Sequence, residues 1–153
     1  MPRRRGRSRG PSEATGVPCR SPGSVDVKVS FRTFYHAWHG EDDDPTKGNH
    51  APEPPYTENK TLFPRRWFGD ENALDYPQAE DTIREAILHG QAQTPQLDRP
   101  GVWKVGILHD NVMTKFVIRR DGTVRGFWPE YGEGVMYVVS VDPLVLVERR
   151  TPW

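Results

Sequence analysis

Cysteine is almost absent from this sequence, because Cys19 is the only one among 153 residues. One thiol cannot form a disulfide within the chain, and it cannot build a zinc cage of the cysteine type. Long apolar runs are absent too, since the longest have only the length of a β-strand and are too short to cross a bilayer as a helix. We therefore expect no membrane partner and no cysteine-held metal.

A net charge of either sign is also lacking, because 21 Lys and Arg residues balance 21 Asp and Glu residues. The balance hides a division of the chain: residues 1–24 carry six Arg and one Glu, and the remainder carries 15 basic and 20 acidic residues. A mildly acidic bulk does not indicate nucleic-acid binding by composition. Contact with RNA therefore needs a local basic patch, for which Arg65, Arg66 and Arg84 are candidates, and a plain surface charge cluster is the alternative.

The beginning of the chain differs in composition from the rest. It is rich in Arg, Gly, Pro and Ser, a mixture that cannot bury enough apolar surface to become ordered. We expect residues 1–24 to form a disordered basic tail and residues 25–153 to form one domain, which suits the chain length. Because Gly10-Pro11-Ser12-Glu13 follows the basic start where an apolar stretch is needed, no cleavable secretory signal is expected.

Three patterns predict the structure of the N-terminal half. Residues 25–32 alternate between apolar and polar side chains, which is the period of a half-buried strand. Residues 40–56 are polar and rich in Pro and acidic side chains, which predicts a long loop. Asp75 is a suitable N-cap and Pro77 suits a first turn, so we expect a helix over residues 77–89.

The C-terminal half has the pattern of β-strands separated by turns. Asp121-Gly122 is the strongest turn signal. The predicted strands cover residues 102–108, 112–119, 123–128, 135–141 and 144–149. The sequence therefore predicts an α+β fold, in which a loop-rich N-terminal half with at least one helix precedes a C-terminal antiparallel β-meander of about five strands.

Three of the five His residues, His36, His39 and His50, lie beside the long polar loop. Their spacing is not that of a zinc protease, because the general-base Glu is missing and we do not expect a helix in this segment. A metal site built from His39 and Asp42–Asp44 is one alternative. We favour no metal, because a bare acidic run is usually a solvated loop.

Two His residues and a Lys suit the cleavage of RNA without a metal. A base must take the proton of the 2′-hydroxyl, and an acid must protonate the leaving 5′-oxygen. Histidine serves both roles because its charge changes near neutral pH. A lysine such as Lys60 can stabilise the charge that builds on the phosphate.

Four motifs in this region resemble those of EndoU-type endoribonucleases. In the first motif, His is followed after three residues by Gly and an acidic residue. The matching segment here is similar to it and reads His36-Ala37-Trp38-His39-Gly40-Glu41. Gly48-Asn49-His50 resembles the second, a Gly-containing turn that ends in His. The third motif, in its bacterial version, has a Lys, then Phe-Pro, then Trp. The segment that resembles it here is Lys60-Thr61-Leu62-Phe63-Pro64-Arg65-Arg66-Trp67. Asp121-Gly122 followed by Phe127-Trp128-Pro129 resembles the turn and the aromatic-Pro pair of the fourth.

The resemblance implies a fold of the barnase–EndoU–RelE group and an RNA-cleaving activity that needs no cofactor, with manganese as an optional aid. It implies that His36, His50 and Lys60 are catalytic and that RNA is cut near uridine, leaving a 2′,3′-cyclic phosphate. Bacterial members are often toxin domains of secreted proteins, each neutralised by an immunity protein. The expected partners are thus RNA and an immunity protein, but not DNA, which lacks the attacking hydroxyl. The cellular location stays open between the cytoplasm and delivery within a secreted toxin.

The predicted substrate-binding residues are Thr123, Trp128 and Tyr131. The resemblance suggests a Thr near the aromatic-Pro pair, and the aromatic rings of Trp128 and Tyr131 can stack on a base, with plain packing as the alternative. The family often has Thr or Ser close before the aromatic-Pro pair, where Gly126 stands here, so the base preference stays open. The rival hypothesis is a non-catalytic α+β interaction module. In that case the His residues are incidental surface features and do not converge with Lys60.

Overall fold

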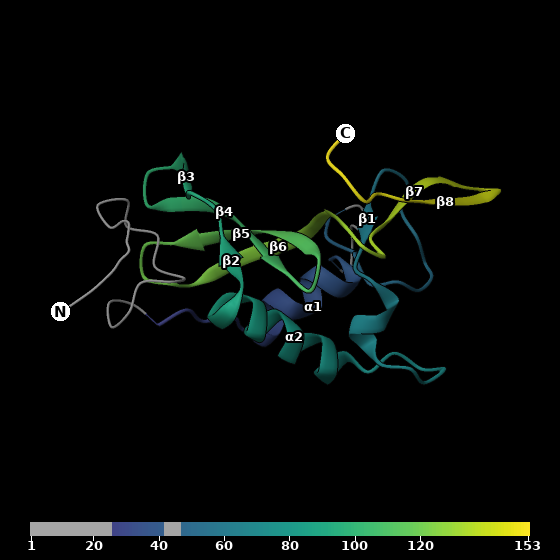
Figure 1. Cartoon of the computed structure of the whole chain (residues 1–153), viewed down its shortest axis with the longest axis horizontal. Coiled ribbons are helices and arrows are strands. Elements are labelled where there is room, and N and C mark those ends of the chain that lie inside the picture. The colour runs from purple at the N-terminus through teal and green to yellow at the C-terminus, as the bar shows by residue number, and fades with distance from the viewer. Residues whose placement is uncertain (1–25, 42–46) are drawn as a thin grey trace.

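The computed structural model describes residues 26–41 and 47–153 (Figure 1). In chain order the elements are α1 (Phe31–His39), β1 (Thr61–Leu62), the 3-10 helix η2 (Arg65–Phe68), α2 (Tyr76–His89), β2 (Gln91–Ala92), β3 (Gln96–Arg99), β4 (Val102–His109), β5 (Val112–Arg119), β6 (Val124–Gly132), β7 (Met136–Val141) and β8 (Leu144–Glu148). Helices followed by antiparallel strands confirm the predicted α+β class. The tail predicted for residues 1–24 lies outside the described residues. Within the described part, neither α-helix has the length and apolar character that crossing a membrane requires.

The strand predicted for residues 25–32 is wrong. Among the described residues of this segment, only Lys28 pairs with another strand, through an isolated parallel bridge to Thr123. Val27 and Val29 are half-buried and pack against the core as extended chain. These contacts explain the alternating pattern. The pattern indicates an extended segment with one buried side, and such a segment has it even where it forms no β-sheet hydrogen bonds.

Helix α1 begins at the end of that segment, where we expected no helix. Ser30 is its N-cap, because its hydroxyl oxygen accepts a hydrogen bond from the backbone N–H of Thr33 at 3.2 Å. The buried side chains lie at helical spacing: they are Phe34, Ala37 and Trp38. The aromatic residues Phe31 and Tyr35 lie on the exposed side and obscure this spacing in the sequence.

Helix α2 confirms the helix predicted over residues 77–89, with a start one residue earlier. The side chain of Asp75 accepts a hydrogen bond from the backbone N–H of Gln78 at 3.0 Å, and Pro77 lies in the first turn. Four residues of one helix face are buried: Ala79, Ile83, Ala86 and Ile87. The cap and the apolar face thus both indicate the same helix, as they do in most stable amphipathic helices.

The strands form two antiparallel sheets where we predicted one meander. The larger sheet has the order β2-β4-β5-β6, with β3 beside β4. The β4–β5 hairpin turns at Asp110 and Asn111, which both have positive φ, as a tight two-residue hairpin turn requires. After β6 the chain changes direction, and β7 pairs with β1 and β8 in a separate three-stranded sheet.

Both α-helices lie against the same side of the larger sheet, and the β7–β8 hairpin extends beyond it at the β1 end (Figure 1). The core between helices and sheet is aromatic. The Trp38 ring lies 5.3 Å from that of Phe63 and 5.7 Å from that of Phe127, centroid to centroid, and both pairs meet edge to face. This packing ties α1, the segment after β1 and β6 together, and these elements carry the candidate site.

Candidate active site

The C-terminal end of α1 brings His36 and His50 together. Carbonyl oxygens at the C-terminal end of a helix are open to donors from outside the helix, and here the chain that returns after the polar loop donates to three of them. The backbone N–H groups of Asn49, His50 and Ala51 donate to the carbonyl oxygens of His36, Ala37 and Trp38 at 3.3, 2.8 and 3.1 Å. Backbone hydrogen bonds therefore hold the second His beside the first.

Gly48 permits this close approach. Its φ is +71°, and a Cβ atom added there would lie 2.0 Å from the carbonyl oxygen of His36. Only glycine fits both the backbone conformation and the contact. Asn49 follows with φ 66°, and its side-chain amide donates to the carbonyl of Pro55 and to the hydroxyl of Thr57 at 3.1 and 3.0 Å.

Lys60 comes to the site from the second sheet. Its carbonyl oxygen accepts a hydrogen bond from the backbone N–H of Val138 on β7 at 2.9 Å. The next residue, Thr61, donates its hydroxyl hydrogen to the carbonyl of Pro129 on β6. Lys60 is thus fixed where the two sheets meet, near the aromatic-Pro pair of β6.

His36, His50 and Lys60 line one open pocket of about 540 Å³. Trp128 of β6 is part of the pocket wall, whereas Thr123 and Tyr131 are not among its lining residues. Thr123 instead donates its backbone N–H to the side chain of Asp121 at the turn before β6. Of the three predicted substrate-binding residues, the structure therefore brings only Trp128 to the pocket.

His50 is held in its neutral form. The residue is only 7% exposed, and its Nδ1 lies 2.6 Å from the carbonyl oxygen of Thr61. Because a carbonyl can only accept, Nδ1 carries the proton and Nε2 keeps its lone pair. Burial lowers the pKa of His50 to about 4, with further lowering by the positive charges of Lys60 and His36, and the hydrogen bond to Thr61 opposes these effects in part.

His36 has a different environment, although it lines the same pocket. Its side chain is 34% exposed, and its Nδ1 lies 3.7 Å from a carboxylate oxygen of Glu41. The other oxygen of Glu41 lies 3.8 Å from the ammonium of Lys47, which also lines the pocket. The two His residues therefore differ in exposure and in neighbours: His36 lies beside a carboxylate, and His50 is buried against a carbonyl.

Of the residues of the metal-site hypothesis, the structure describes only His39. The ring of His39 packs between those of Tyr35 and Tyr76, with centroids 4.9 and 5.1 Å away. Asp42–Asp44 lie outside the described residues. Within residues 26–41 and 47–153, no three His, Cys, Asp or Glu side chains form a group that could hold a metal ion.

The three arginines proposed as a basic patch do not line the pocket: they are Arg65, Arg66 and Arg84. Their contacts fit the alternative, a surface charge cluster. Arg65 donates to the carbonyl of Gly69 at 2.8 Å. Arg66 binds the carboxylate and the carbonyl of Asp110, at 3.1 and 2.7 Å. Arg84 lies 3.4 Å from a carboxylate oxygen of Asp81, within the same helix.

Other cations supply the positive charge of the pocket. Besides Lys60 they are Lys47 and Arg149, and the sequence reasoning assigned no role to Arg149. Tyr137, which the reasoning also missed, lines the pocket and donates its hydroxyl hydrogen to the side chain of Asn59 at 2.8 Å. Only the pairing of β7 with β1 brings Tyr137 near Lys60, and no sequence pattern indicates that pairing.

Comparison of the chain with protein-family models, curated protein sequences and solved structures found no match.

Proposed function

We propose that the protein is a metal-independent endoribonuclease that cleaves single-stranded RNA by transesterification. The observation that carries this proposal is the meeting of His36, His50 and Lys60 in one open pocket. Two imidazoles and an ammonium are the groups that this chemistry needs, and they come from three separate segments of the chain. A non-catalytic module gives no reason for their convergence.

The burial and the tautomer of His50 support one assignment of the two roles. His50 is the base, because its neutral form has a proton on Nδ1 and a lone pair on Nε2. It takes the 2′-hydroxyl proton while the 2′-oxygen attacks the adjacent phosphorus. His36, half-exposed beside Glu41, is the acid and protonates the 5′-oxygen as the P–O5′ bond breaks. The products are a 2′,3′-cyclic phosphate and a 5′-hydroxyl, and no water or metal takes part.

Lys60 stabilises the negative charge that increases on the phosphate oxygens during attack. An ammonium held at this place acts as a fixed point charge beside the reacting phosphate. The RNA itself carries the nucleophile next to the reacting phosphorus, so the protein needs no covalent intermediate. The pocket wall also contains Trp128, whose ring is available to pack against a base.

The experiment is incubation of the purified protein with a mixed-sequence RNA, with and without a chelator, and with DNA of the same sequence. We expect cleavage of RNA in both conditions, products that end in a 2′,3′-cyclic phosphate, and intact DNA. Lys60→Ala should reduce cleavage by about 10²-fold or more. Lys104→Ala is the matched control, because Lys104 pairs with Asp98 and does not line the pocket. Equal cleavage of DNA, or full activity of Lys60→Ala, contradicts the proposal.

A further inference from the structure

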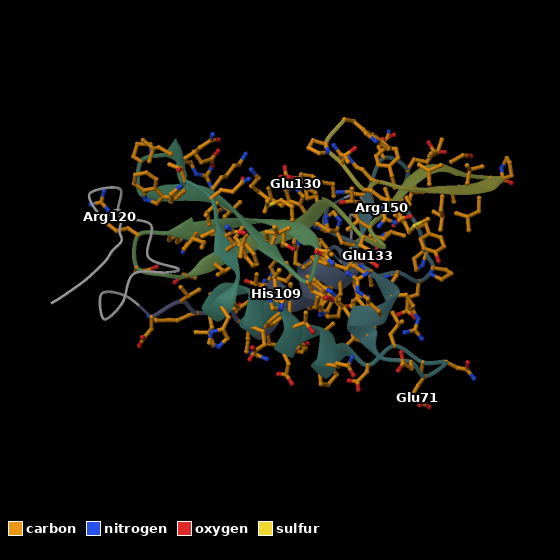
Figure 2. The ribbon with its side chains drawn as sticks, in the orientation of Figure 1. Glu71, His109, Arg120, Glu130, Glu133 and Arg150 are labelled. Carbon is orange, nitrogen blue, oxygen red and sulfur yellow. The ribbon has the colours of Figure 1, made fainter. Side chains whose placement is uncertain are left out.

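A second group of side chains lies at the end of β8, and two of its three members line the same pocket. The chain leaves β8 through Arg149 and Arg150, and Figure 2 labels the second of them. The guanidinium carbon of Arg149 lies 4.8 Å from the centroid of the Trp153 ring. The ring of Tyr137 meets the same Trp153 ring edge to face, also at 4.8 Å. Arg149 and Tyr137 line the pocket together with Lys60.

The backbone fixes the position of Arg149 firmly. Its N–H donates to the carbonyl of Val135 at 2.7 Å, and its carbonyl accepts from the N–H of Gly132 at 2.9 Å. Tyr137 is fixed as well, by its strand pairing with Thr61 and by the hydrogen bond of its hydroxyl to Asn59. The group is therefore built on the same pairing of β1 with β7 that positions Lys60.

Arg149 has a cationic head without an anionic partner. Within residues 26–41 and 47–153, its buried Nε has no hydrogen-bond partner, and no carboxylate lies within ion-pair distance of its guanidinium. The neighbouring residue differs, because Arg150 lies 3.1 Å from a carboxylate oxygen of Glu148. A guanidinium that is stacked on a ring and lacks a carboxylate offers its planar donors to an anion.

The chemistry of this group matches one nucleotide. Arginine binds phosphate through two parallel N–H groups, and an exposed indole offers a face on which a base can stack. Trp153 is 68% exposed, which leaves much of its surface open to a ligand. Among the described residues that line the pocket, Glu130 is the acidic one, and its carboxylate lies 3.7 Å from the ammonium of Lys115, so part of its charge is balanced.

We infer that Arg149 and Trp153 form a subsite for the nucleotide next to the one that is cleaved. Arg149 binds the phosphate beside the scissile one, and Trp153 stacks on the neighbouring base. Tyr137 supports the Trp153 ring from the side. This inference rests on the proposed function, because it assumes that His36, His50 and Lys60 act on the scissile phosphate in the same pocket.

The test measures binding separately from cleavage. The probe is a fluorescein-labelled RNA of eight nucleotides in which every 2′-hydroxyl is methylated, so that it cannot be cut. Its Kd is measured by anisotropy at several salt concentrations for the wild-type chain, Arg149→Ala and Trp153→Ala. The matched controls are Arg150→Ala, which removes the adjacent paired cation, and Phe31→Ala, which removes an aromatic side chain that is 77% exposed elsewhere.

We expect Trp153→Ala to raise the Kd roughly 5- to 150-fold, the usual range for loss of one stacked base. Arg149→Ala should raise it about 10-fold and reduce the slope of log K against log salt by about 0.7, as loss of one phosphate contact on a single strand does. Arg149→Lys should keep the slope, because the charge remains, and should still bind more weakly. Both controls should bind like the wild type.

Two results would separate the subsite from the proposed function. If Arg149→Ala and Trp153→Ala bind the probe like their controls while the wild type cleaves RNA, the subsite is wrong and the nuclease stands. If the wild type neither binds the probe nor cleaves RNA, the proposed function fails. Thermal melting of each variant is measured in parallel. A lowered Tm with an unchanged Kd overturns the subsite and gives Trp153 a structural role.

Discussion

The Nδ1 atom of His50 lies 2.6 Å from the carbonyl oxygen of Thr61, the residue that follows Lys60. One hydrogen bond thus joins the segment that returns from the polar loop to strand β1. It fixes the tautomer of the buried imidazole, and it fixes the distance between the candidate base and the chain that carries the candidate cation. The proposed chemistry and the local fold therefore depend on the same contact.

The first prediction separates these two roles. His50→Asn keeps an N–H group near the place of Nδ1 but has no counterpart of Nε2. It should reduce RNA cleavage by about 10²- to 10⁴-fold and leave the free energy of unfolding nearly unchanged. His50→Ala should lose as much activity and also about 1 kcal/mol or more of stability, because the Thr61 carbonyl loses its partner. Cleavage assays and urea unfolding measure both quantities. Full activity of His50→Asn would exclude His50 as the base.

The second prediction concerns the two His residues as a unit. His36→Ala should reduce cleavage by about 10²- to 10⁴-fold. Adding His50→Asn to it should reduce cleavage scarcely further, because groups that act in one step do not contribute additively. His89→Ala is the control, since His89 lies at the end of α2 with Glu85 as its neighbour and does not line the pocket. Losses that multiply in the double variant would mean that the two residues act independently.

The third prediction follows from the lowered pKa of His50, about 4 in the folded state against an ordinary value of 6.5. The unfolded chain binds a proton at His50 more readily than the folded chain does, so this group's stability is fully present above pH 6.5 and is lost as the pH falls toward 4. The free energy of unfolding should decrease by about 2 kcal/mol between pH 7 and pH 5 from this residue. Urea unfolding at both values measures the change. In His50→Asn this part of the pH-dependent loss of stability should be absent. If the wild type and His50→Asn lose the same stability between pH 7 and pH 5, the prediction is wrong.

The fourth prediction concerns the acidic side of the pH–activity profile. A base with an ordinary histidine pKa is mostly protonated at pH 5.5 and largely inactive there. Because burial lowers the pKa of His50 to about 4, it stays neutral at this pH, and cleavage should remain close to its maximum. Initial rates between pH 4 and pH 8 measure the profile. A steep loss of rate near pH 6.5 would point to another base.

The fifth prediction tests why glycine stands before Asn49. Gly48→Ala should cost more than about 2 kcal/mol of stability and most of the activity, because its Cβ would meet the carbonyl oxygen of His36 at 2.0 Å. Gly101→Ala is the matched control. Gly101 also has a positive φ, +77°, but a Cβ there meets nothing within 4 Å, so only about 1 kcal/mol is expected. If urea unfolding shows that the two variants lose equal stability, the contact between residue 48 and the His36 carbonyl does not contribute to the free energy of unfolding.

Much of the fold could be predicted from local signals. The Asp75 cap, the Pro77 turn and the apolar face predict α2, and the turn at Asp121-Gly122 predicts the pairing of β5 with β6. These signals suffice because a cap and a tight turn depend on residues that are neighbours in the chain. The motif order also indicated His36, His50 and Lys60, which the structure brings to one pocket, while their catalytic role stays a prediction.

Other features depend on contacts between distant residues. Helix α1 forms because Phe34 and Trp38 find an aromatic core made by later segments, while the sequence before it alternates like a strand. The two-residue strand β1 is too short to carry a pattern of its own, and its pairing with β7 divides the predicted meander into two sheets.

The sequence by itself determined α2 and strands β4 to β6, because these depend on short-range spacing, and its resemblance to a family indicated the candidate reactive groups. Only the tertiary structure decided that Arg149 and Tyr137 join them, that His50 is buried, and that Thr123 and Tyr131 do not line the pocket. The physical reason is that burial and strand pairing arise between residues far apart in the chain, here from Asn59 to Tyr137 and from Gly132 to Arg149.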